Sequence, residues 1–395
     1  MNVETKHFDV VIAGAGPAGS SLAIRLAKQG RRVALVEQKR FPRHKLCGEF
    51  ISPECLSHFR ELGVLDELTA TGVELRRTVF YARKSASVAV PSEWFGQHAN
   101  ALGLSRAKMD LTLVERARGL GVQIFEEHNA VGLVREGDTV IGIRVKNPDG
   151  IACEFRAPLT IDASGRSRVL VRHQESGRRA KADFVAFKTH LTGVSIPKGD
   201  CEIYAYRGGY GGCSGVENGR HNLCFIVAAK LAKQYSGDAE SIMRNVLFTN
   251  QRAKDALTNA AVAEPWLAVA VENYGRFNLA PASGLIAVGD AAAFIDPFTG
   301  SGMLLALECS RIAAKAIEMT TGLAFEELAD SYTAKHREVF DRRLRVSSLL
   351  RNIAFVPFLA ELTIKILSLS ATLTRRIAQS TRPSTRNHRS WIDTA

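Results

Sequence analysis

A glycine pattern near the N-terminus constrains the fold of this chain more than any other feature. The pattern is G-x-G-x-x-G, formed by Gly14, Gly16 and Gly19. The apolar residues 8–13 before it predict a buried strand, and the Ala- and Leu-rich residues 17–29 after it predict a helix. Residues 32–37 are again apolar and predict a second strand. A strand, a helix and a strand in this order indicate a βαβ unit, and therefore a parallel sheet.

The same pattern is typical of a dinucleotide site. The first glycine permits a tight turn, the second lets the backbone approach a pyrophosphate, and the third lets the helix pack closely on the strand. Pro17 and Ala18 begin the helix, whose free N–H groups and partial positive charge attract phosphates. Glu37 ends the second strand, where a carboxylate accepts hydrogen bonds from an adenosine ribose. Glu37 therefore favours FAD or NAD over a cofactor with a 2′-phosphate.

A second glycine-rich segment separates FAD from NAD. An expected strand leads into Gly289 and Asp290, and a turn containing Pro297, Gly300 and Gly302 leads into a helix. The carboxylate can bind a ribityl hydroxyl, and the turn can aim N–H groups at the flavin N1–C2=O edge, where reduction builds negative charge. An NAD-only dehydrogenase needs neither feature. FAD is thus the predicted cofactor.

The remaining segments interrupt the parallel sheet twice. Residues 73–91 and 184–228 alternate in strand fashion, and residues 130–158 have the turns of a β-meander. The predicted fold is an α/β Rossmann domain interleaved with a mixed or antiparallel β-sheet substrate domain, with C-terminal helices after it. The expected boundaries are residues 1–72, 105–178 and 276–335 for the cofactor domain, 73–104 and 179–275 for the substrate domain, and 336–395 for the C-terminal helices and basic tail.

These motifs together resemble those of the FAD-dependent oxidoreductases related to p-hydroxybenzoate hydroxylase. The loop from Phe41 to Pro53 is more similar to the geranylgeranyl-reductase and flavin-halogenase branches of that family. The resemblance covers about residues 8–330 and implies a glutathione-reductase-like FAD domain with a mixed-sheet substrate domain. It also implies that Arg106, which forms an R-x-x-x-D pattern with Asp110, contacts the cofactor.

Two motifs depart from the family pattern. The family has Asp-Gly, a small residue and Ser-x-Val-Arg, where this chain has Asp162 followed by Ala163 and Ser164. The resemblance puts Asp162 at the FAD, but it leaves open whether NAD(P)H reduces the flavin directly or a partner flavin reductase does so. The Trp-x-Trp-x-Ile-Pro element of related halogenases does not occur in the sequence, which disfavours halogenation.

The loop after the second strand contains further candidates. Arg43 and Lys45 fit a pyrophosphate or a nicotinamide phosphate, or else a solvated basic loop. The reductase branch has a Cys-Gly pair beside the flavin where Cys47 stands, so Cys47 is a predicted catalytic residue, although a lone cysteine is often a small buried hydrophobe. Glu49 is a weaker polar candidate. Tyr210 lies in a Gly-Tyr-Gly segment that faces flavin and substrate in that branch, and it is the second catalytic candidate, with a β-bulge as the alternative.

On these residues the sequence favours an FAD-dependent monooxygenase that hydroxylates a hydrophobic aromatic, polyketide or isoprenoid molecule through a flavin C4a-hydroperoxide. The alternative is a reductase of isoprenoid or lipid double bonds, in which Cys47 or a neighbour delivers the proton. A flavin-binding protein without turnover is a third reading, which the intact glycine motifs disfavour. No metal-ligand spacing and no nucleic-acid motif occurs among the residues.

The charge of the chain adds one expectation about partners. The formal net charge is +12, and the residues after His336 include ten Arg and one Lys against four acidic residues, interleaved with Leu, Ile and Phe. Such a segment is typical either of a peripheral membrane-surface helix or of helices packed on the FAD domain with a solvated basic face. With no signal-peptide pattern, and seven scattered cysteines without a C-x-x-C pair, a cytoplasmic location is expected.

Overall fold

The computed structural model describes residues 4–84, 86–95, 99–174, 182–271, 275–294, 300–322, 324–354 and 357–380. One of the two large sheets is parallel and has the strand order β21-β13-β2-β3-β9. Its strands are β2 (Val10–Ala13), β3 (Val33–Val36), β9 (Gln123–Phe125), β13 (Leu159–Asp162) and β21 (Leu285–Ala287). Helix α1 (Pro17–Lys28) joins β2 to β3, which confirms the predicted βαβ unit.

The second large sheet is mostly antiparallel, with the order β18-β14-β17-β16-β15-β6-β7 and β19 also paired to β14. Its strands are β6 (Arg77–Tyr81), β7 (Ser87–Pro91), β14 (Phe184–Thr192), β15 (Asp200–Tyr206), β16 (Gly209–Gly215), β17 (His221–Ala228), β18 (Ala261–Val262) and β19 (Leu267–Val271). Strands β6 and β15 pair in parallel, so the two β-rich insertions share one sheet. The predicted interleaved fold class is therefore confirmed, while its residue boundaries stay predictions.

Smaller sheets complete the described strands. The expected meander is formed by β10 (Asn129–Glu136), β11 (Thr139–Lys146) and β12 (Ala152–Arg156), with β1 (Glu4–His7) at its edge. The others are β4 (Phe50–Ile51), β5 (Val73–Leu75) and β8 (Ala101–Gly103) in one sheet, and β20 (Gly275–Arg276) with β22 (Ala293–Phe294) in another. The meander sheet packs on one face of the parallel sheet through Phe8 and Phe155, whose rings lie 5.8 Å apart.

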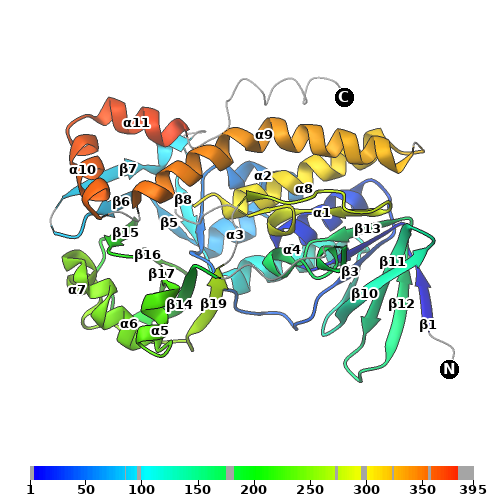
Figure 1. Cartoon of the computed structure of the whole chain (residues 1–395), viewed down its shortest axis with the longest axis horizontal. Coiled ribbons are helices and arrows are strands. Elements are labelled where there is room, and N and C mark those ends of the chain that lie inside the picture. The colour runs from blue at the N-terminus through cyan, green and yellow to red at the C-terminus, as the bar shows by residue number, and fades with distance from the viewer. Residues whose placement is uncertain are drawn as a thin grey trace.

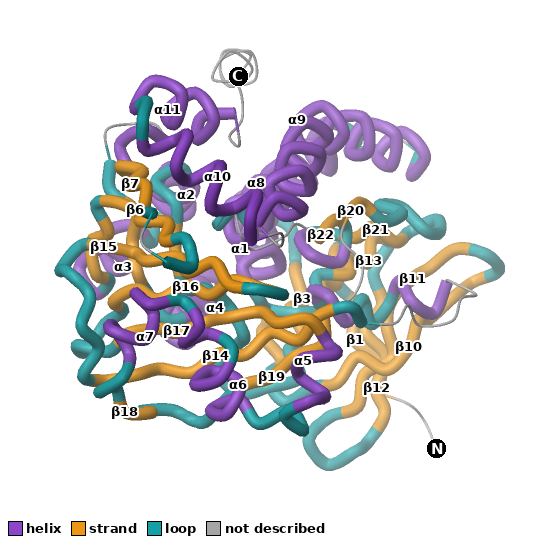
Figure 2. Tube along the Cα trace, turned by 60° about the vertical axis from the view of Figure 1, so that its left-hand side comes forward, coloured by secondary structure: helices purple, strands orange, loops and turns teal. Residues whose placement is uncertain are grey.

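Helices cover the other face of the parallel sheet and one side of the antiparallel sheet (Figures 1 and 2). The first group is α1, α2 (Cys55–Leu62), α3 (Leu65–Thr71), α4 (Arg106–Gly119), α8 (Gly302–Met319) and α9 (Phe325–Ala354). Its members share a hydrophobic core with β2, β3 and β13. The second group, α5 (Ala229–Gln234), α6 (Ala239–Asn245) and α7 (Gln251–Leu257), packs on the antiparallel sheet.

The C-terminal helices extend across both domains. Helix α9 lies along α8, whereas α10 (Pro357–Ser368) packs on β7 and α11 (Ala371–Ser380) packs on the 3₁₀ turn Ser92–Phe95 (Figure 1). The expectation of helices packed on the FAD domain thus holds for α9, while α10 and α11 lie on the substrate domain. Among the described residues, no helix is long and apolar enough to cross a membrane.

A buried ionic cluster ties α2 to α8. The Glu308 carboxylate is 3.1 Å from Nε2 of His58 and accepts a hydrogen bond from Arg311 at 2.6 Å. Arg25 of α1 donates to Nδ1 of His58 at 3.3 Å and to the Glu61 carboxylate of α2 at 2.9 Å, so three helices meet at this cluster. Burial alone raises the pKa of Glu308, but His58 and Arg311 outweigh it and hold the pKa well below the ordinary value.

We expect Glu308→Gln to lower the free energy of unfolding at pH 7 by about 3 kcal/mol, because it removes the carboxylate that pairs directly with Arg311 in this buried cluster. A carboxyl whose pKa is lowered by folding stabilises the protein above its unfolded pKa of about 4.3, and the stabilisation fades as the pH falls below that value. The difference between variant and wild type in urea denaturation should therefore shrink on acidification. Glu318→Gln is the matched control, since Glu318 is half exposed and pairs with Lys315 on the same helix. It should change stability by under about 1 kcal/mol, and an equal effect of the two variants would contradict the account.

Candidate active site

A long cavity of about 650 Å³ begins at the carboxyl ends of the parallel strands and continues between the antiparallel sheet and the C-terminal helices. Most of the predicted cofactor residues line its first part, which we call the cofactor end. They are Gly14, Gly16, Pro17, Ala18, Glu37, Arg43, Lys45, Arg106, Asp290, Gly300 and Gly302. Pro297 lies outside the described residues. The site residues, predicted from segments far apart in sequence, are thus brought together in one place.

The glycines of the first turn leave room for a ligand at one position only. A Cβ on Gly14, whose φ is +105°, would lie 2.4 Å from the Ala163 carbonyl oxygen, and a Cβ on Gly19 would lie 1.9 Å from that of Gly14. These two glycines serve the packing of turn, strand and helix. A Cβ on Gly16 would meet nothing nearer than the Arg106 guanidinium, at 3.7 Å. Gly16 therefore presents open backbone to the cavity at the N-terminus of α1, which fits a pyrophosphate.

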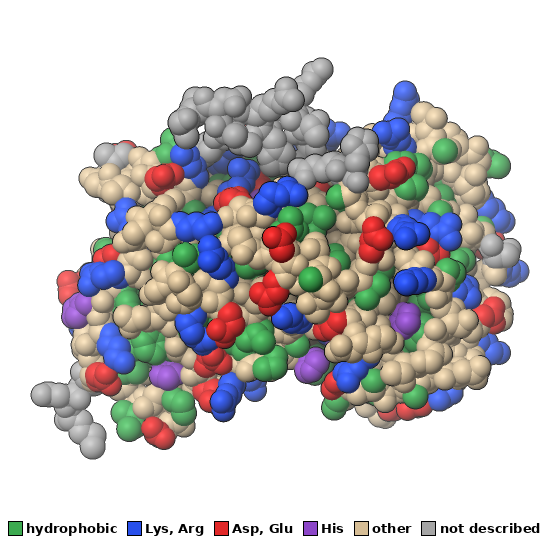
Figure 3. Space-filling model, turned by 180° about the vertical axis from the view of Figure 1, so that it is seen from behind, with side chains coloured by type: hydrophobic (Ala, Val, Ile, Leu, Met, Phe, Trp, Pro, Cys, Tyr) green, Lys and Arg blue, Asp and Glu red, His purple; other side chains and the backbone are tan. Residues whose placement is uncertain are grey.

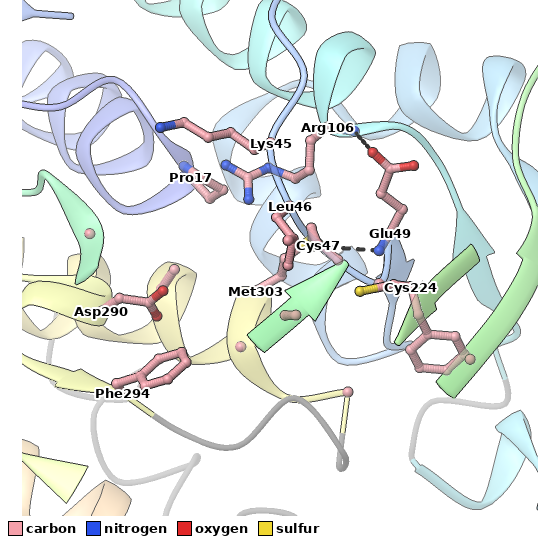
Figure 4. Close-up of a pocket in the computed structure, with 18 of the residues that line it drawn as sticks. Pro17, Lys45, Leu46, Cys47, Glu49, Arg106, Cys224, Asp290, Phe294 and Met303 are labelled. Atoms are coloured by element: carbon pink, nitrogen blue, oxygen red, sulfur yellow. Dashed lines mark hydrogen bonds between the residues drawn. The ribbon is translucent and has the colours of Figure 1, made fainter. Parts of the chain in front are cut away.

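Two ionisable side chains at the cofactor end have shifted pKa values that a bound cofactor would offset. Burial, together with neighbouring Arg43, lowers the pKa of Lys45. Burial raises the pKa of Asp290, although Arg166 and Arg106 oppose the shift. Figure 4 shows Lys45 near Pro17, with Asp290 on the same side of the pocket. An anionic phosphate near Lys45 and a hydroxyl donor near Asp290 would each favour the charged form of its partner, as the phosphates and ribityl chain of FAD provide.

A row of alternating charges runs along the wall of this end. Glu37 binds Arg43 at 3.0 Å, Arg43 binds Asp110 at 2.8 Å, and Asp110 accepts two bonds from Arg106, each of 2.8 Å. The Glu37 Oε2 atom also accepts the Ala15 N–H at 3.1 Å, whereas Oε1 accepts only the Lys39 N–H at 3.2 Å among the described residues, so Oε1 is the atom better placed for a ribose hydroxyl. Within the described part of the chain, the Arg43 Nε is buried without a hydrogen-bond partner. These donors and acceptors fit FAD, and the cofactor-binding roles of Glu37, Arg43 and Arg106 stay predictions.

Asp162 was expected to lie at the FAD, but it does not line the cavity. Its carboxylate accepts N–H groups of Ser164 at 3.0 Å, Leu170 at 2.8 Å and Val171 at 2.9 Å, and the side chain is fully buried. Asp162 therefore holds the turn that lines the cavity and does not line it. Gly289 is also behind the wall, because a Cβ there would lie 2.6 Å from the Cβ of Ala18.

Cys47 lies where the cofactor end meets the rest of the cavity, half-buried, with Leu46 beside it (Figure 4). Its sulfur accepts the Glu49 N–H at 3.4 Å, and its carbonyl accepts a side-chain N–H of Asn222 at 3.1 Å. Burial opposes the charge on Arg106, whereas Asp110 and, to a smaller extent, Cys47 hold the pKa of that guanidinium above its usual value. The thiol thus faces a permanent positive charge.

The loop that holds Cys47 is fixed by a buried cluster that the sequence interpretation missed. The Glu49 carboxylate binds the Lys188 ammonium on one oxygen and Nε2 of His190, at 2.6 Å, on the other. It also accepts the backbone N–H of Arg106 at 2.8 Å. Burial raises the pKa of Glu49, but His190 and Lys188 outweigh it and keep the pKa below the ordinary value. Lys188 also donates a hydrogen bond to the backbone carbonyl of Lys45 at 3.1 Å, which fixes the loop at a second point.

A signal for this cluster was present in the sequence. Lys188 and His190 stand two residues apart in the otherwise apolar strand β14, so they point to the same face of the sheet. Charged residues on the inner face of a strand need a buried partner. The partner, Glu49, is more than 130 positions away, and its backbone φ of +52° is uncommon for a residue other than glycine.

Tyr210, 6% exposed, lines the cavity in an apolar cluster with Phe294 and Leu46, whereas its neighbours Tyr204 and Tyr206 are buried on the other side of the sheet and do not line it. Beyond Cys47 the cavity becomes apolar, and we call this part the apolar arm. The arm continues between strands β6, β7 and β15 and the helices α10 and α11. Among its apolar lining residues are Phe80, Val88, Val90, Ile203, Ile364 and Leu367. No group of three or more His, Cys, Asp or Glu side chains in the described residues could hold a metal ion.

We expect Gly16→Ala and Gly14→Ala to separate cofactor binding from folding. The added methyl at Gly16 meets open space in the protein but occupies the path of the pyrophosphate, so FAD affinity should fall about tenfold, or ~1.4 kcal/mol, with unchanged thermal stability of the cofactor-free protein. At Gly14 the positive φ and the clash with Ala163 should lower that stability by about 1–3 kcal/mol. Flavin fluorescence titration and thermal denaturation measure the two effects. A Gly16→Ala protein that binds FAD as tightly as wild type would contradict this site.

Comparison with known proteins agrees with this geometry. The chain is 28% identical to digeranylgeranylglycerophospholipid reductase 2 of Methanopyrus kandleri, over 88% of each chain. It is 24% identical to tryptophan 2-halogenase of Chondromyces crocatus, over 78% of this chain and 60% of the relative. A solved structure of a geranylgeranyl bacteriochlorophyll reductase-like protein from Thermoplasma acidophilum superposes with a TM-score of 0.75 at 20% identity, covering 97% of this chain and 94% of the other.

The family of the chain follows from a further comparison. The model of the family described as FAD binding domain matches residues 7–347, which include both glycine motifs, the Cys47 loop and most of the antiparallel sheet. Because this match spans most of the sequence, the protein belongs to the FAD binding domain family of FAD-dependent oxidoreductases.

Proposed function

We propose that the protein is an FAD-dependent reductase that saturates a carbon–carbon double bond in a long, apolar, isoprenoid-like chain. The observation that carries this proposal is the position of Cys47, a thiol fixed at the junction between the cofactor end and the apolar arm. Similarity to a digeranylgeranylglycerophospholipid reductase over 88% of both chains supports the substrate class. Reduction thereby takes precedence over the oxygenation that the sequence favours.

Each part of the cavity has a role in this reaction. FAD, when bound and reduced, supplies a hydride to one carbon of the double bond. The apolar arm, lined by residues such as Val90 and Ile203, binds the chain and excludes water from the reacting carbons. Cys47 holds a proton at Sγ and gives it to the second carbon, so that the double bond gains two hydrogens in all. The Glu49 N–H and the Arg106 guanidinium lie beside the sulfur that gives up this proton.

The electrons come, in this proposal, from NAD(P)H, either directly or through a partner flavin reductase. Mixing the FAD-loaded protein with NADH or NADPH under argon distinguishes the two routes. Loss of the oxidised-flavin absorbance supports direct reduction. Absorbance that persists until a flavin reductase is added supports the partner.

We expect turnover to continue without oxygen. With chemically reduced FAD under argon, the protein should saturate the geranylgeranyl chains of an archaeal-type phospholipid, because neither the hydride nor the proton comes from O₂. Consumption of the lipid only under air would support the monooxygenase and contradict the reductase. Lipid extracts analysed by mass spectrometry provide the measurement.

Cys47→Ser should slow this saturation about 100-fold or more, the effect of removing a general acid, while leaving the FAD content unchanged. The matched control is Cys153→Ala in strand β12, since Cys153 is buried in the meander sheet, outside the cavity lining. It should turn over at the wild-type rate. A Cys47→Ser protein as active as the control would remove Cys47 from the mechanism.

A further inference from the structure

Helix α10 has apolar residues on two sides. On its inner side, Ile364 is 8% exposed and lines the apolar arm together with Leu367. Its outer side carries large apolar side chains at spacings of four, four and three residues, which places them along one stripe of the helix. These are Phe358, Leu362 and Ile366 in the helix and Leu369 directly after its end, with exposed fractions of 74%, 44%, 46% and 86%. An apolar stripe that faces away from the protein is typical of a surface that meets another apolar phase.

Exposed cations lie on the same two C-terminal helices. They are Lys365 in α10 and Arg375 and Arg376 in α11, and the one acidic residue of these two helices is Glu361, which pairs with Lys365 at 3.2 Å. Leu373, 38% exposed, extends the apolar surface into α11. On the face opposite that of Figure 1, by contrast, Lys and Arg are interspersed with Asp and Glu (Figure 3). The outer face of α10 and α11 thus combines exposed apolar and cationic side chains with a single acidic residue.

We propose that the outer face of α10 and α11 docks on an anionic membrane surface. Apolar side chains there would enter the boundary between headgroups and acyl chains, and Lys365, Arg375 and Arg376 would meet the anionic headgroups. Charge complementarity favours this partner over a second copy of the chain, since two copies would bring the same cations together. Docking requires no spanning helix, and none is found among the described residues.

The position of these helices connects the surface to the site. Their inner sides supply Thr363, Ile364 and Leu367 from α10, and Thr374 and Ile377 from α11, to the wall of the apolar arm. The same two helices therefore separate the arm from the docking face. An apolar chain leaving the membrane would pass α10 and α11 to enter the apolar arm and reach Cys47. This entry route rests on the proposed function, whereas docking itself does not.

Vesicle sedimentation with the full chain loaded with FAD tests the docking. Wild-type protein should bind vesicles of phosphatidylglycerol and phosphatidylcholine and bind phosphatidylcholine vesicles much more weakly. Leu362→Gln/Ile366→Gln/Leu369→Gln should weaken binding to the anionic vesicles about tenfold or more. Arg375→Gln/Arg376→Gln should weaken it about 30-fold at low salt. The matched control is Ile151→Gln, which removes a 63% exposed apolar side chain from a turn of the meander sheet and should leave binding unchanged.

Circular dichroism and the FAD content establish that each variant is folded. Equal binding to the two kinds of vesicle, or no effect of either multiple variant, would overturn the proposal. So would self-association in analytical ultracentrifugation that the triple variant abolishes in a protein that binds no vesicles, because the face would then be an interface between copies. Sedimentation needs no turnover, so an inactive protein that still binds as described would refute the reductase and leave the docking intact.

Discussion

The arrangement of the site depends on one buried carboxylate. Glu49 belongs to the loop that follows the βαβ unit, whereas Lys188 and His190 belong to the antiparallel sheet, so the ion pair with Lys188 and the contact with His190 join the two domains at the cavity. Because all three side chains are at most 3% exposed, removing the Glu49 carboxylate would leave the buried Lys188 ammonium without its ion-pair partner, at a cost of about 3–5 kcal/mol. The cluster therefore specifies where the loop lies, and with it the position of Cys47 between cofactor and substrate.

The cofactor half of the site could be predicted because it depends on local sequence. Gly14, Gly16 and Gly19 act within one turn, and Glu37 follows at the end of the adjacent strand. Arg106 and Asp110 are one helical turn apart, which sets their pairing by helix geometry alone. In each case the spacing along the chain determines the spacing in the protein.

The remaining features depend on long-range register, which the sequence does not reveal directly. Glu49 contacts Lys188 only because β14 packs against the loop that carries Glu49. The Asp162 carboxylate accepts the N–H groups of Leu170 and Val171, and the sequence does not specify the path of the turn that contains them. The outer apolar stripe of α10 was visible only as part of a generally apolar segment. The structure divides that segment into residues that face the cavity and residues, such as Leu369, that face away from it.

The mass of the product tests the central claim most directly. The FAD-loaded protein, given chemically reduced flavin and a geranylgeranyl-chain phospholipid in phosphatidylglycerol vesicles under argon, should yield lipid that has gained two hydrogens for each reacted double bond. Saturation requires only a hydride and a proton, both of which the site provides. A product that has gained an oxygen atom, formed only in air, would contradict the account and identify the protein as a monooxygenase.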